Sequence, residues 1–466
     1  MSLENLKGKK IAMVFGQSIE GCGVTRTGTE AQLWCNKNGV DFTIYSYDER
    51  MYNRREAHEL KFESFMKDDI PNIVQQLNIY DVVIFNSYPS SKFENDTIKA
   101  FYEDLVKKIT TVKVGFMHEL NKTNTDKIPY LVGMMNQMDV IMNFSEETWF
   151  SKIISELLPS KKLGERVKKF TMWFNFDELE QEYRNKYSLN DKERKLLYLG
   201  RWTTMKVPRR VLDLAPLLRN DDPTFLYELR GIERSIGAKC DIFDHPNTLD
   251  LTGKKAPEET TGFVPVYGPY VRNEGMAELA KSLFGASFYR MPKAPKDYGD
   301  RMEYTQIETI AVGTIPVFDK HWGENNRTRD GRRYIDIPFS AIYSDENDLQ
   351  GTTDKLIEVA NNPELQQKYR DTSFEIVKQE FSADIVLPEM FNYFLNVGID
   401  KEKFATDDDM ILALTDNQEY VNEANVQKEA GEIVVLGIRE LTNNILCVID
   451  GKKEKEIKKW KIKKGS

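Results

Sequence analysis

Two glycine-containing turns carry residue types that bind anions. The first, EGCGVT at Glu20–Thr25, follows an apolar run at 10–16 and precedes a stretch with helical spacing. Glycines at a strand-to-helix turn let backbone amides approach an anion at the positive end of the helix. The spacing is not that of the dinucleotide-binding GxGxxG motif. Gly21, Cys22 and Gly23 are therefore candidate anion-binding residues, and a purely structural turn is the alternative.

The second turn, GRWTTMK at Gly200–Lys206, directly follows another apolar run. It places Arg201 and Lys206 five residues apart. Two cations on such a turn can clamp a diphosphate leaving group, because its negative charge grows in the transition state. An ordinary surface turn, with Thr203 and Thr204 capping the next helix, is the other interpretation.

A carboxylate on a helix is the third feature. Residues 302–312 have helical periodicity and continue through Gly313 and Thr314 into the strand-like run IPVF. Glu308 is suited to accept hydrogen bonds from both hydroxyls of a ribose. We expect Gly313 and Thr314 to close the turn near a phosphate, and we interpret Glu303 equally well as a structural surface acid.

His118 and Glu119 form the fourth group. They stand at the end of the strand-like run KVGFM in a chain with only four histidines. Ligands of open α/β sheets bind at the carboxyl ends of the strands. A histidine beside a carboxylate there can act as a general acid or base, although a lone histidine is more often structural. Two interpretations of this pair remain open: a role in catalysis or sugar contact, and a structural role.

Alternating elements must position these groups. Short apolar runs separated by polar stretches of helical length, such as 96–108, are typical of parallel βαβ units. The runs in the first part of the chain lie at 10–16, 42–47, 81–87, 113–119 and 139–145. After a charge-rich crossing at 179–195, further runs follow at 196–200, 224–229, 286–290, 314–318 and 340–344. The sequence therefore predicts an α/β protein with two doubly wound domains.

The domain boundaries follow from this pattern. We expect an N-terminal Rossmann-like domain over 1–178 and a second over 179–398 that ends in a returning helix near 385–395. Residues 399–466 then form a small β-rich appendage of unknown role. Residues 452–464 hold eight lysines against two glutamates, with Trp460 among them. This tail either grips phosphates while the indole stacks on a base or keeps the chain soluble.

Charge restricts how the chain can contact nucleic acid. The net charge of −9 argues against coating DNA through bulk electrostatics. Contacts must therefore use local basic patches, each of which is also interpretable as a solvated surface. The candidates are 161–169, Arg209, Arg210, Arg327 and Arg329.

Cysteine usage and hydropathy exclude further classes. The four cysteines have no CxxC spacing, so neither a zinc site nor a disulfide framework is expected, and no metal ligands are assigned. No apolar run approaches the roughly 18 residues that cross a bilayer. The amino terminus lacks the apolar stretch of a secretory signal. We therefore expect a cytoplasmic protein with no membrane partner.

Taken in order, these clusters resemble the GT-B class of glycosyltransferases. They resemble more closely the DNA α-glucosyltransferases of T-even phages, which modify 5-hydroxymethylcytosine. The resemblance rests on EGCGVT, the GR-TT-K turn, GIERS at Gly231–Ser235, the EYT-Q-IE helix, GTIPVF, and GEN at Gly323–Asn325. These motifs occur in the same order over roughly the first 395 residues.

The resemblance implies a GT-B fold whose second domain binds a UDP-sugar while the acceptor faces the first. His118 and Glu119 would lie at the sugar and acceptor, where a base helps to deprotonate the hydroxymethyl oxygen. The implied donor-binding residues are Gly21, Cys22, Gly23, Arg201, Lys206, Glu233, Arg234, Glu308, Gly313 and Thr314. The family has aspartate where this chain has Glu119, so glucose and a pentose such as arabinose both remain open.

The resemblance also implies retention of the anomeric configuration, with departure and attack on one face and no covalent intermediate. No cofactor is obligatory, and a divalent cation is at most stimulatory. The partner is double-stranded DNA whose modified cytosine is flipped out. A glycosyltransferase acting on another glycan or a lipid, a non-enzymatic DNA-binding protein and a nucleotide-binding regulator without turnover are the alternatives. DNA sequence preference and oligomeric state stay open.

Overall fold

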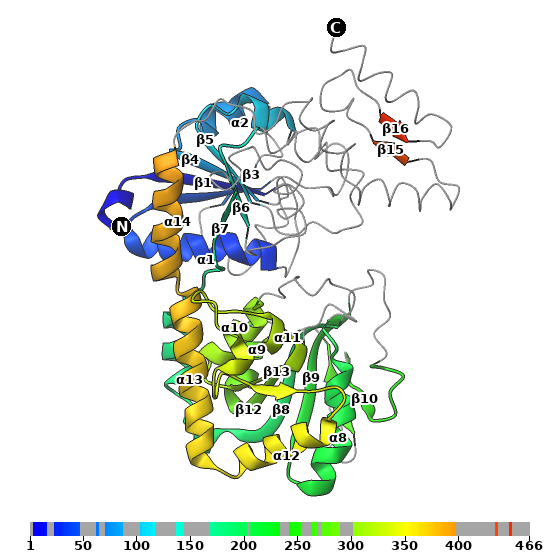
Figure 1. Ribbon diagram of the computed structural model, residues 1–466. Helices are drawn as coiled ribbons and strands as arrows, with labels where there is room; N and C mark the ends of the chain where they lie inside the picture. Colours follow the sequence, from blue (N-terminus) through cyan, green and yellow to red (C-terminus); the bar gives the residue numbers. More distant parts are fainter. Residues whose placement is uncertain are drawn as a thin grey trace. The chain divides into compact units, whose positions relative to one another are not determined.

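The computed structural model describes 3–15, 23–46, 62–64, 70–86, 103–116, 137–143, 167–202, 206–233, 242–252, 263–268, 270, 272–288, 302–397, 434–436 and 447–449 (Figure 1). The chain divides into two compact units. Unit 1 comprises Met1–Trp173 and Ala383–Ser466, and unit 2 comprises Phe174–Ser382. In the sequence, unit 2 is thus one continuous stretch inserted between the two segments of unit 1.

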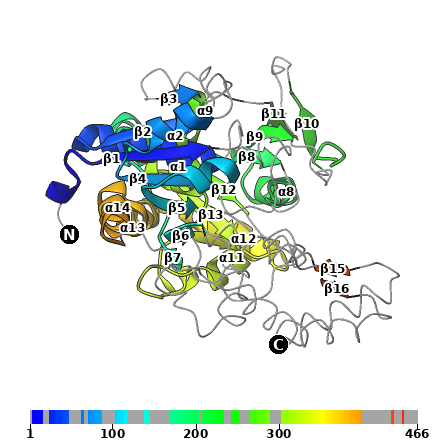
Figure 2. The same ribbon diagram turned by 90° about the horizontal axis from the view of Figure 1, so that it is seen from above.

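Unit 1 contains a seven-stranded sheet in the order β3-β2-β1-β4-β5-β6-β7, which can be followed in Figure 2. All its strand pairs are parallel. The strands are β1 (Lys10–Phe15), β2 (Asp41–Ser46), β3 (Phe62–Ser64), β4 (Val82–Asn86), β5 (Val112–Phe116), β6 (Val140–Asn143) and β7 (Val167–Lys169). Described helices are η1 (Leu3–Leu6), α1 (Gly23–Asn38), α2 (Ile70–Leu77) and α14 (Ala383–Val397). Strands buried on both faces read as continuous apolar runs, which is why the runs in the sequence predicted them.

Helix α14 returns to unit 1 at the end of the described core. Its Asp384 accepts a hydrogen bond from the indole of Trp34 at 2.7 Å, and Phe391 packs on the rings of Trp34 and Phe42 at centroid distances of 6.3 and 6.0 Å. The sequence predicts a second domain that extends to 398, whereas the structure places α14 with unit 1. The predicted first boundary at 178 lies five residues after the observed one.

Unit 2 contains a second seven-stranded parallel sheet, in the order β10-β11-β9-β8-β12-β13-β14. The strands are β8 (Glu193–Trp202), β9 (Leu226–Glu233), β10 (Thr248–Asp250), β11 (Val264–Tyr267), β12 (Ser282–Ser287), β13 (Ile315–Asp319) and β14 (Ile342–Ser344). The longer helices are α8 (Arg209–Asp221), α9 (Arg272–Lys281), α10 (Tyr304–Ala311), α12 (Leu349–Ala360) and α13 (Pro363–Phe381). The shorter ones are α7 (Asp177–Leu179), η5 (Glu180–Arg184), η6 (Leu189–Asp191), α11 (Lys320–Asn325) and η7 (Tyr334–Asp336).

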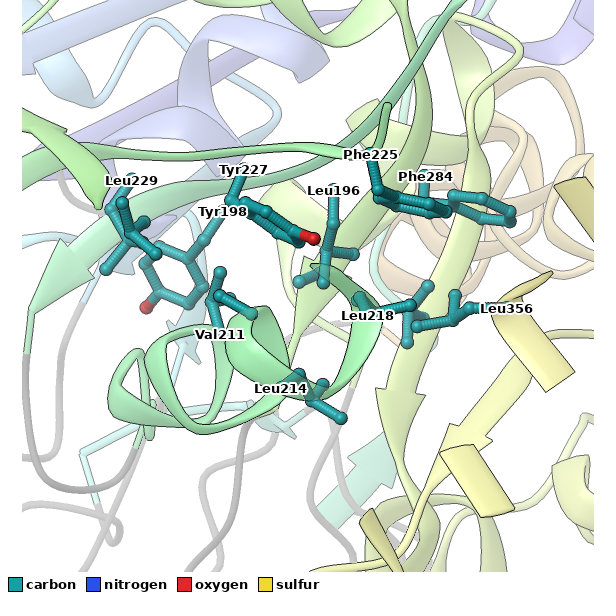
Figure 3. Packing of buried hydrophobic residues seen from close by; sticks show 14 of the residues in the cluster. Leu196, Tyr198, Val211, Leu214, Leu218, Phe225, Tyr227, Leu229, Phe284 and Leu356 are labelled. Atoms are coloured by element: carbon teal, nitrogen blue, oxygen red, sulfur yellow. The ribbon is translucent and has the colours of Figure 1, made fainter. Parts of the chain in front are cut away.

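The core of unit 2 lies between α8 and the middle of the sheet (Figure 3). Val211, Leu214 and Leu218 follow a spacing of three and four residues, which puts them on one face of α8. Phe225 stacks between Tyr227 and Phe284, at centroid distances of 6.0 and 5.8 Å. This packing anchors α8 against β8, so the end of the strand and the start of the helix have defined positions.

The two ends of unit 2 lie side by side. The amide of Phe174 donates to the carbonyl oxygen of Phe381 at 2.7 Å, and Phe174 pairs with Ser382 in an isolated parallel bridge. Unit 2 therefore closes on itself where the chain enters and leaves it.

The predicted α/β class with two doubly wound sheets is confirmed. Strand β12 begins directly after α9 and covers Ser282–Ser287, four residues earlier than the predicted run. In the predicted appendage, β15 (Val434–Leu436) and β16 (Cys447–Ile449) pair antiparallel. Within the described residues, no helix has the length and apolar character that a membrane span requires.

Candidate functional site

The carboxyl edge of the unit 2 sheet is the candidate site. Strand β8 lies in the middle of this sheet, between β9 and β12, so the strand order changes direction there. Ligands of open parallel sheets bind at the carboxyl ends beside such a switch point. Helix α8 begins shortly after the end of β8, and the positive end of a helix attracts an anion.

Two glycines shape the end of β8. Gly200 has a φ of 153°, which disfavours other residues. Gly231 pairs with Gly200 across the β8–β9 register, and a Cβ on Gly231 would clash with the Gly200 carbonyl oxygen. The hydroxyl of Tyr198 donates to the carbonyl oxygen of Arg201 at 2.9 Å. The backbone that carries Arg201 is therefore held in place.

Lys206 connects this turn to the start of α10. Its ammonium group hydrogen-bonds the carboxylate of Glu303, while the Glu303 amide donates to Gln306 at 2.7 Å in a capping box. The next residue, Val207, has a φ of 40°. A β-branched residue in this region is strained, and such strain is concentrated at functional sites. Glu303 thus positions Lys206 as well as capping a helix.

Glu308 lies on α10 and is largely buried. Its Oε1 accepts a hydrogen bond from Arg272 Nε at 3.2 Å. Arg272 Nη1 is also 3.8 Å from Glu178. Burial raises the pKa of the Tyr270 phenol, and the charge of Glu308 adds to that effect. The carboxylate of Glu308 is therefore oriented by a cation on a neighbouring helix.

The structure does not bring Gly313 and Thr314 to this edge. They stand at the amino end of β13, and the strands are parallel, so they lie at the opposite edge of the sheet. Thr314 donates its hydroxyl to the Leu279 carbonyl, and a Cβ on Gly313, whose φ is 79°, would lie 2.9 Å from Arg370 Nε. This corrects the prediction that they close a turn near a phosphate. They shape the return from α10 to β13.

Three cations gather at that opposite edge. Lys192 donates to the carbonyl of Ala280, the penultimate residue of α9, and Arg370 donates to the carbonyls of Arg184 and Tyr187. These groups satisfy carbonyls at segment ends. Burial, together with the charges of Arg370 and Arg184, lowers the pKa of Lys192 to about 7.

The candidate DNA contacts separate into two kinds. Arg210 is 3% exposed, hydrogen-bonds the Asp319 carboxylate and donates to the Ser344 carbonyl at 3.2 Å. The prediction that Arg210 contacts DNA is therefore corrected, because its guanidinium is held inside unit 2. The side chain of its neighbour Arg209 is 51% exposed.

Arg327 and Arg329 are exposed. They lie on a short loop in which the backbones of Arg327 and Arg333 pair in an isolated antiparallel β-bridge. The amide of Arg329 donates to the Glu380 carboxylate at 2.6 Å. The loop backbone is thus anchored while both side chains face solvent.

The remaining predicted residues are described only in part. Gly23 is the first residue of α1 and Glu233 the last of β9, with the Glu233 side chain outside the described residues. His118, Glu119, Gly21, Cys22 and Arg234 also lie outside them.

Sequence reasoning missed Arg272 and Asp319. No motif marks Arg272, whereas Asp319, whose carboxylate also accepts from the His321 amide at 2.8 Å, directly follows a predicted strand and precedes a short helix. Within the described part of the chain, no group of three or more His, Cys, Asp or Glu residues is arranged to hold a metal ion.

Two doubly wound parallel sheets in separate units define the GT-B class of fold, and the resemblance stated from the motifs is confirmed. The chain is similar to the DNA alpha-glucosyltransferase of Enterobacteria phage T4, being 25% identical over 404 residues that cover 82% of this chain and 99% of the relative. A family model of DNA alpha-glucosyltransferase matches residues 254–364, within unit 2.

Solved structures agree with this fold. An alpha-glucosyltransferase in complex with UDP matches with a TM-score of 0.68 and 21% identity over 83% of this chain and 99% of that one. The complex with UDP-glucose and DNA containing an abasic site matches with a TM-score of 0.68 and 20% identity, over 83% and 98%. Anabaena Alr3699/HepE in complex with UDP matches with a TM-score of 0.54 and 10% identity, over 82% and 98%.

Proposed function

We propose that this protein is a retaining glycosyltransferase that moves a sugar from a UDP-sugar to the hydroxymethyl oxygen of 5-hydroxymethylcytosine in DNA. The observation that carries the donor half is the carboxyl end of β8, where Arg201 is the penultimate residue of the strand and Lys206 precedes α8 by three positions. The acceptor half is supported by similarity to the T4 enzyme over nearly its whole length. The place of action is then the cytoplasm of an infected bacterium.

The chemistry follows from the charges at this edge. Breaking the bond between the anomeric carbon and UDP develops negative charge on the diphosphate. Arg201 and Lys206 stabilise that charge more in the transition state than in the bound substrate. Glu308, oriented by Arg272 at 3.2 Å, accepts hydrogen bonds from the ribose. Two cations make a divalent ion unnecessary, and such an ion is at most stimulatory.

The acceptor side rests on the sequence. His118 and Glu119 follow β5, which ends at Phe116, and we assign them to the sugar and acceptor. Gly21, Cys22, Gly23, Glu233 and Arg234 complete the proposed donor contacts. The acceptor hydroxyl attacks the face from which UDP departs, and the departing phosphate oxygen receives its proton. The first Rossmann-like unit then carries the acceptor, while the role of 399–466 stays open.

DNA binding is proposed for the exposed arginines Arg209, Arg327 and Arg329. With a net charge of −9, the protein must hold phosphates through such local groups, with the target base flipped out. Replacing Arg327 and Arg329 together by Gln is expected to weaken binding uniformly across sequences. The slope of log K against log salt should then fall by about 0.9 for each lost phosphate contact. An unchanged slope, measured by fluorescence anisotropy, would remove these two residues from the interface.

One experiment can identify both the sugar and the acceptor. The sugar is glucose by similarity to the T4 enzyme, and a pentose such as arabinose is the second candidate because Glu119 stands where the family has aspartate. A non-DNA glycan or a lipid is the alternative acceptor.

The test is mass spectrometry of nucleosides from 5-hydroxymethylcytosine DNA incubated with the protein and either UDP-glucose or UDP-arabinose. Unmodified DNA serves as the control. A hexose or pentose mass shift confined to hydroxymethylated DNA supports the proposal and names the sugar. Hydrolysis or binding of the donor without any mass shift contradicts the DNA acceptor and favours another glycan.

A further inference from the structure

Trp202, the last residue of β8, has a buried indole with no visible hydrogen-bond partner. Its side chain is 2% exposed, and its Nε1–H has no acceptor among the residues that the structure describes. Two other tryptophans behave differently. Trp34 donates to Asp384 at 2.7 Å, and Trp173 donates to the Thr27 carbonyl at 2.9 Å.

An unsatisfied buried N–H is unfavourable. Buried polar groups in folded proteins are nearly always paired, because losing water without gaining a partner destabilises the fold. Phenylalanine would supply an aromatic ring without this donor. Ring packing alone, such as the edge contact of Trp202 with Phe243 at 5.4 Å, therefore does not explain a tryptophan here.

The position of Trp202 suggests what the donor is for. It directly follows Arg201, and in the β8–β9 register it stands opposite Glu233. Nε1 lies 2.9 Å from the point where a Cβ on Gly231 would sit, so only a glycine at 231 leaves room for the indole. The indole N–H thus lies beside Gly231, near the end of β8 that carries the proposed diphosphate-binding residues.

We propose that the indole N–H of Trp202 donates a hydrogen bond to an oxygen of the bound uridine diphosphate. Trp202 is then an affinity-determining residue of the donor site. This inference rests on the proposed function, since it requires that the edge binds a UDP-sugar. The same N–H that destabilises the free protein strengthens the complex, because the ligand supplies its acceptor.

The test measures UDP affinity by calorimetry for the full chain. Trp202→Phe removes the donor, and Trp202→3-benzothienylalanine removes it while keeping the bicyclic shape. Both should bind UDP about 10-fold more weakly, as expected for the loss of one hydrogen bond to a charged acceptor. Trp173→Phe is the matched control, because it removes the same atoms from a satisfied indole in unit 1. It should lower the thermal midpoint and leave UDP affinity unchanged.

Two comparisons sharpen the result. In spectra of ¹⁵N-tryptophan protein, the indole resonance that disappears in Trp202→Phe should shift when UDP is added, and the Trp173 resonance should not. Repeating the calorimetry with UMP and uridine locates the acceptor oxygen, because the affinity difference persists only with ligands that carry it. Unchanged UDP affinity in both Trp202 variants overturns the inference. If the unsubstituted protein does not bind UDP, the proposed function itself fails.

Discussion

Arg272 Nε lies 3.2 Å from Glu308 Oε1. The arginine opens α9 and the carboxylate stands in the middle of α10, so the pair joins the two helices that flank β12 in the chain. Holding a carboxylate in one orientation is what ribose recognition needs, because the two hydroxyls are accepted only at a defined position.

We predict that Glu308→Gln weakens donor binding with little loss of stability. The amide keeps the shape but loses the charge that strengthens hydrogen bonds, so KM for the UDP-sugar should rise about 10-fold. Initial rates at varied UDP-sugar concentration measure it. Asp371→Asn is the control, since Asp371 also pairs with an arginine, Arg184 at 2.9 Å, away from the carboxyl edge. Equal losses in the two variants would contradict the assignment.

Arg201→Gln and Lys206→Gln should both lower kcat/KM for the UDP-sugar by about 100-fold, the typical effect of removing one group that stabilises transition-state charge. Their stabilities should differ. Lys206→Gln leaves Glu303 without its ammonium partner, whereas no ion pair involving Arg201 is found within the described ranges. Thermal midpoints beside steady-state rates separate the two effects. A fall in midpoint for Arg201→Gln that matches its loss of rate would indicate a structural role instead.

Arg210→Met should unfold more easily than Arg209→Met by about 3–5 kcal/mol, because it leaves the Asp319 carboxylate buried without its charged partner. The change at exposed Arg209 should stay within about 0.5 kcal/mol. Urea denaturation followed by circular dichroism provides both values. Equal free energies of unfolding for the Arg209→Met and Arg210→Met variants would show that the buried ion pair does not form.

The lowered pKa of Lys192 should make the free energy of unfolding depend on pH. Burial lowers its pKa from 10.5 to about 7 in the folded protein, so between these values the unfolded chain binds the proton more strongly. Stability should therefore rise with pH across this window, with a contribution of up to about 1.4 kcal/mol per pH unit. Comparing urea midpoints of the original protein and Lys192→Met between pH 7 and 10 tests this. The variant should lack that part of the slope, and identical slopes would exclude the lysine as its source.

The fold was largely predictable from sequence because strands buried on both faces are continuous apolar runs. The unit to which α14 belongs was not predictable, since it depends on the contact of Phe391 with Trp34 and Phe42. The spacing of apolar residues along a helix does not indicate which distant surface the helix will pack against.

The position of Gly200–Lys206 at the carboxyl end of a strand was predictable because the motif continues an apolar run. Its binding of a diphosphate stays a prediction. Gly313 and Thr314 were misplaced because a turn before a strand and a turn after it look alike in composition, yet they lie at opposite edges of a parallel sheet. Arg209 and Arg210 are neighbours with identical chemistry, and only the partner Asp319, 109 positions from Arg210, separates a buried residue from an exposed one.

Unit 2 is one continuous stretch of the chain, Phe174–Ser382, and the amide of Phe174 donates to the carbonyl oxygen of Phe381 at 2.7 Å, so its two ends lie together. Two crossovers in the DNA, one at each of these codons, would exchange the whole of unit 2, the proposed nucleotide-sugar domain, for that of a relative. Unit 1, the proposed acceptor side, would be inherited unchanged. The proposed nucleotide-binding residues Arg201, Lys206 and Glu308 can thus be exchanged together by recombination, without gradual substitution inside unit 2.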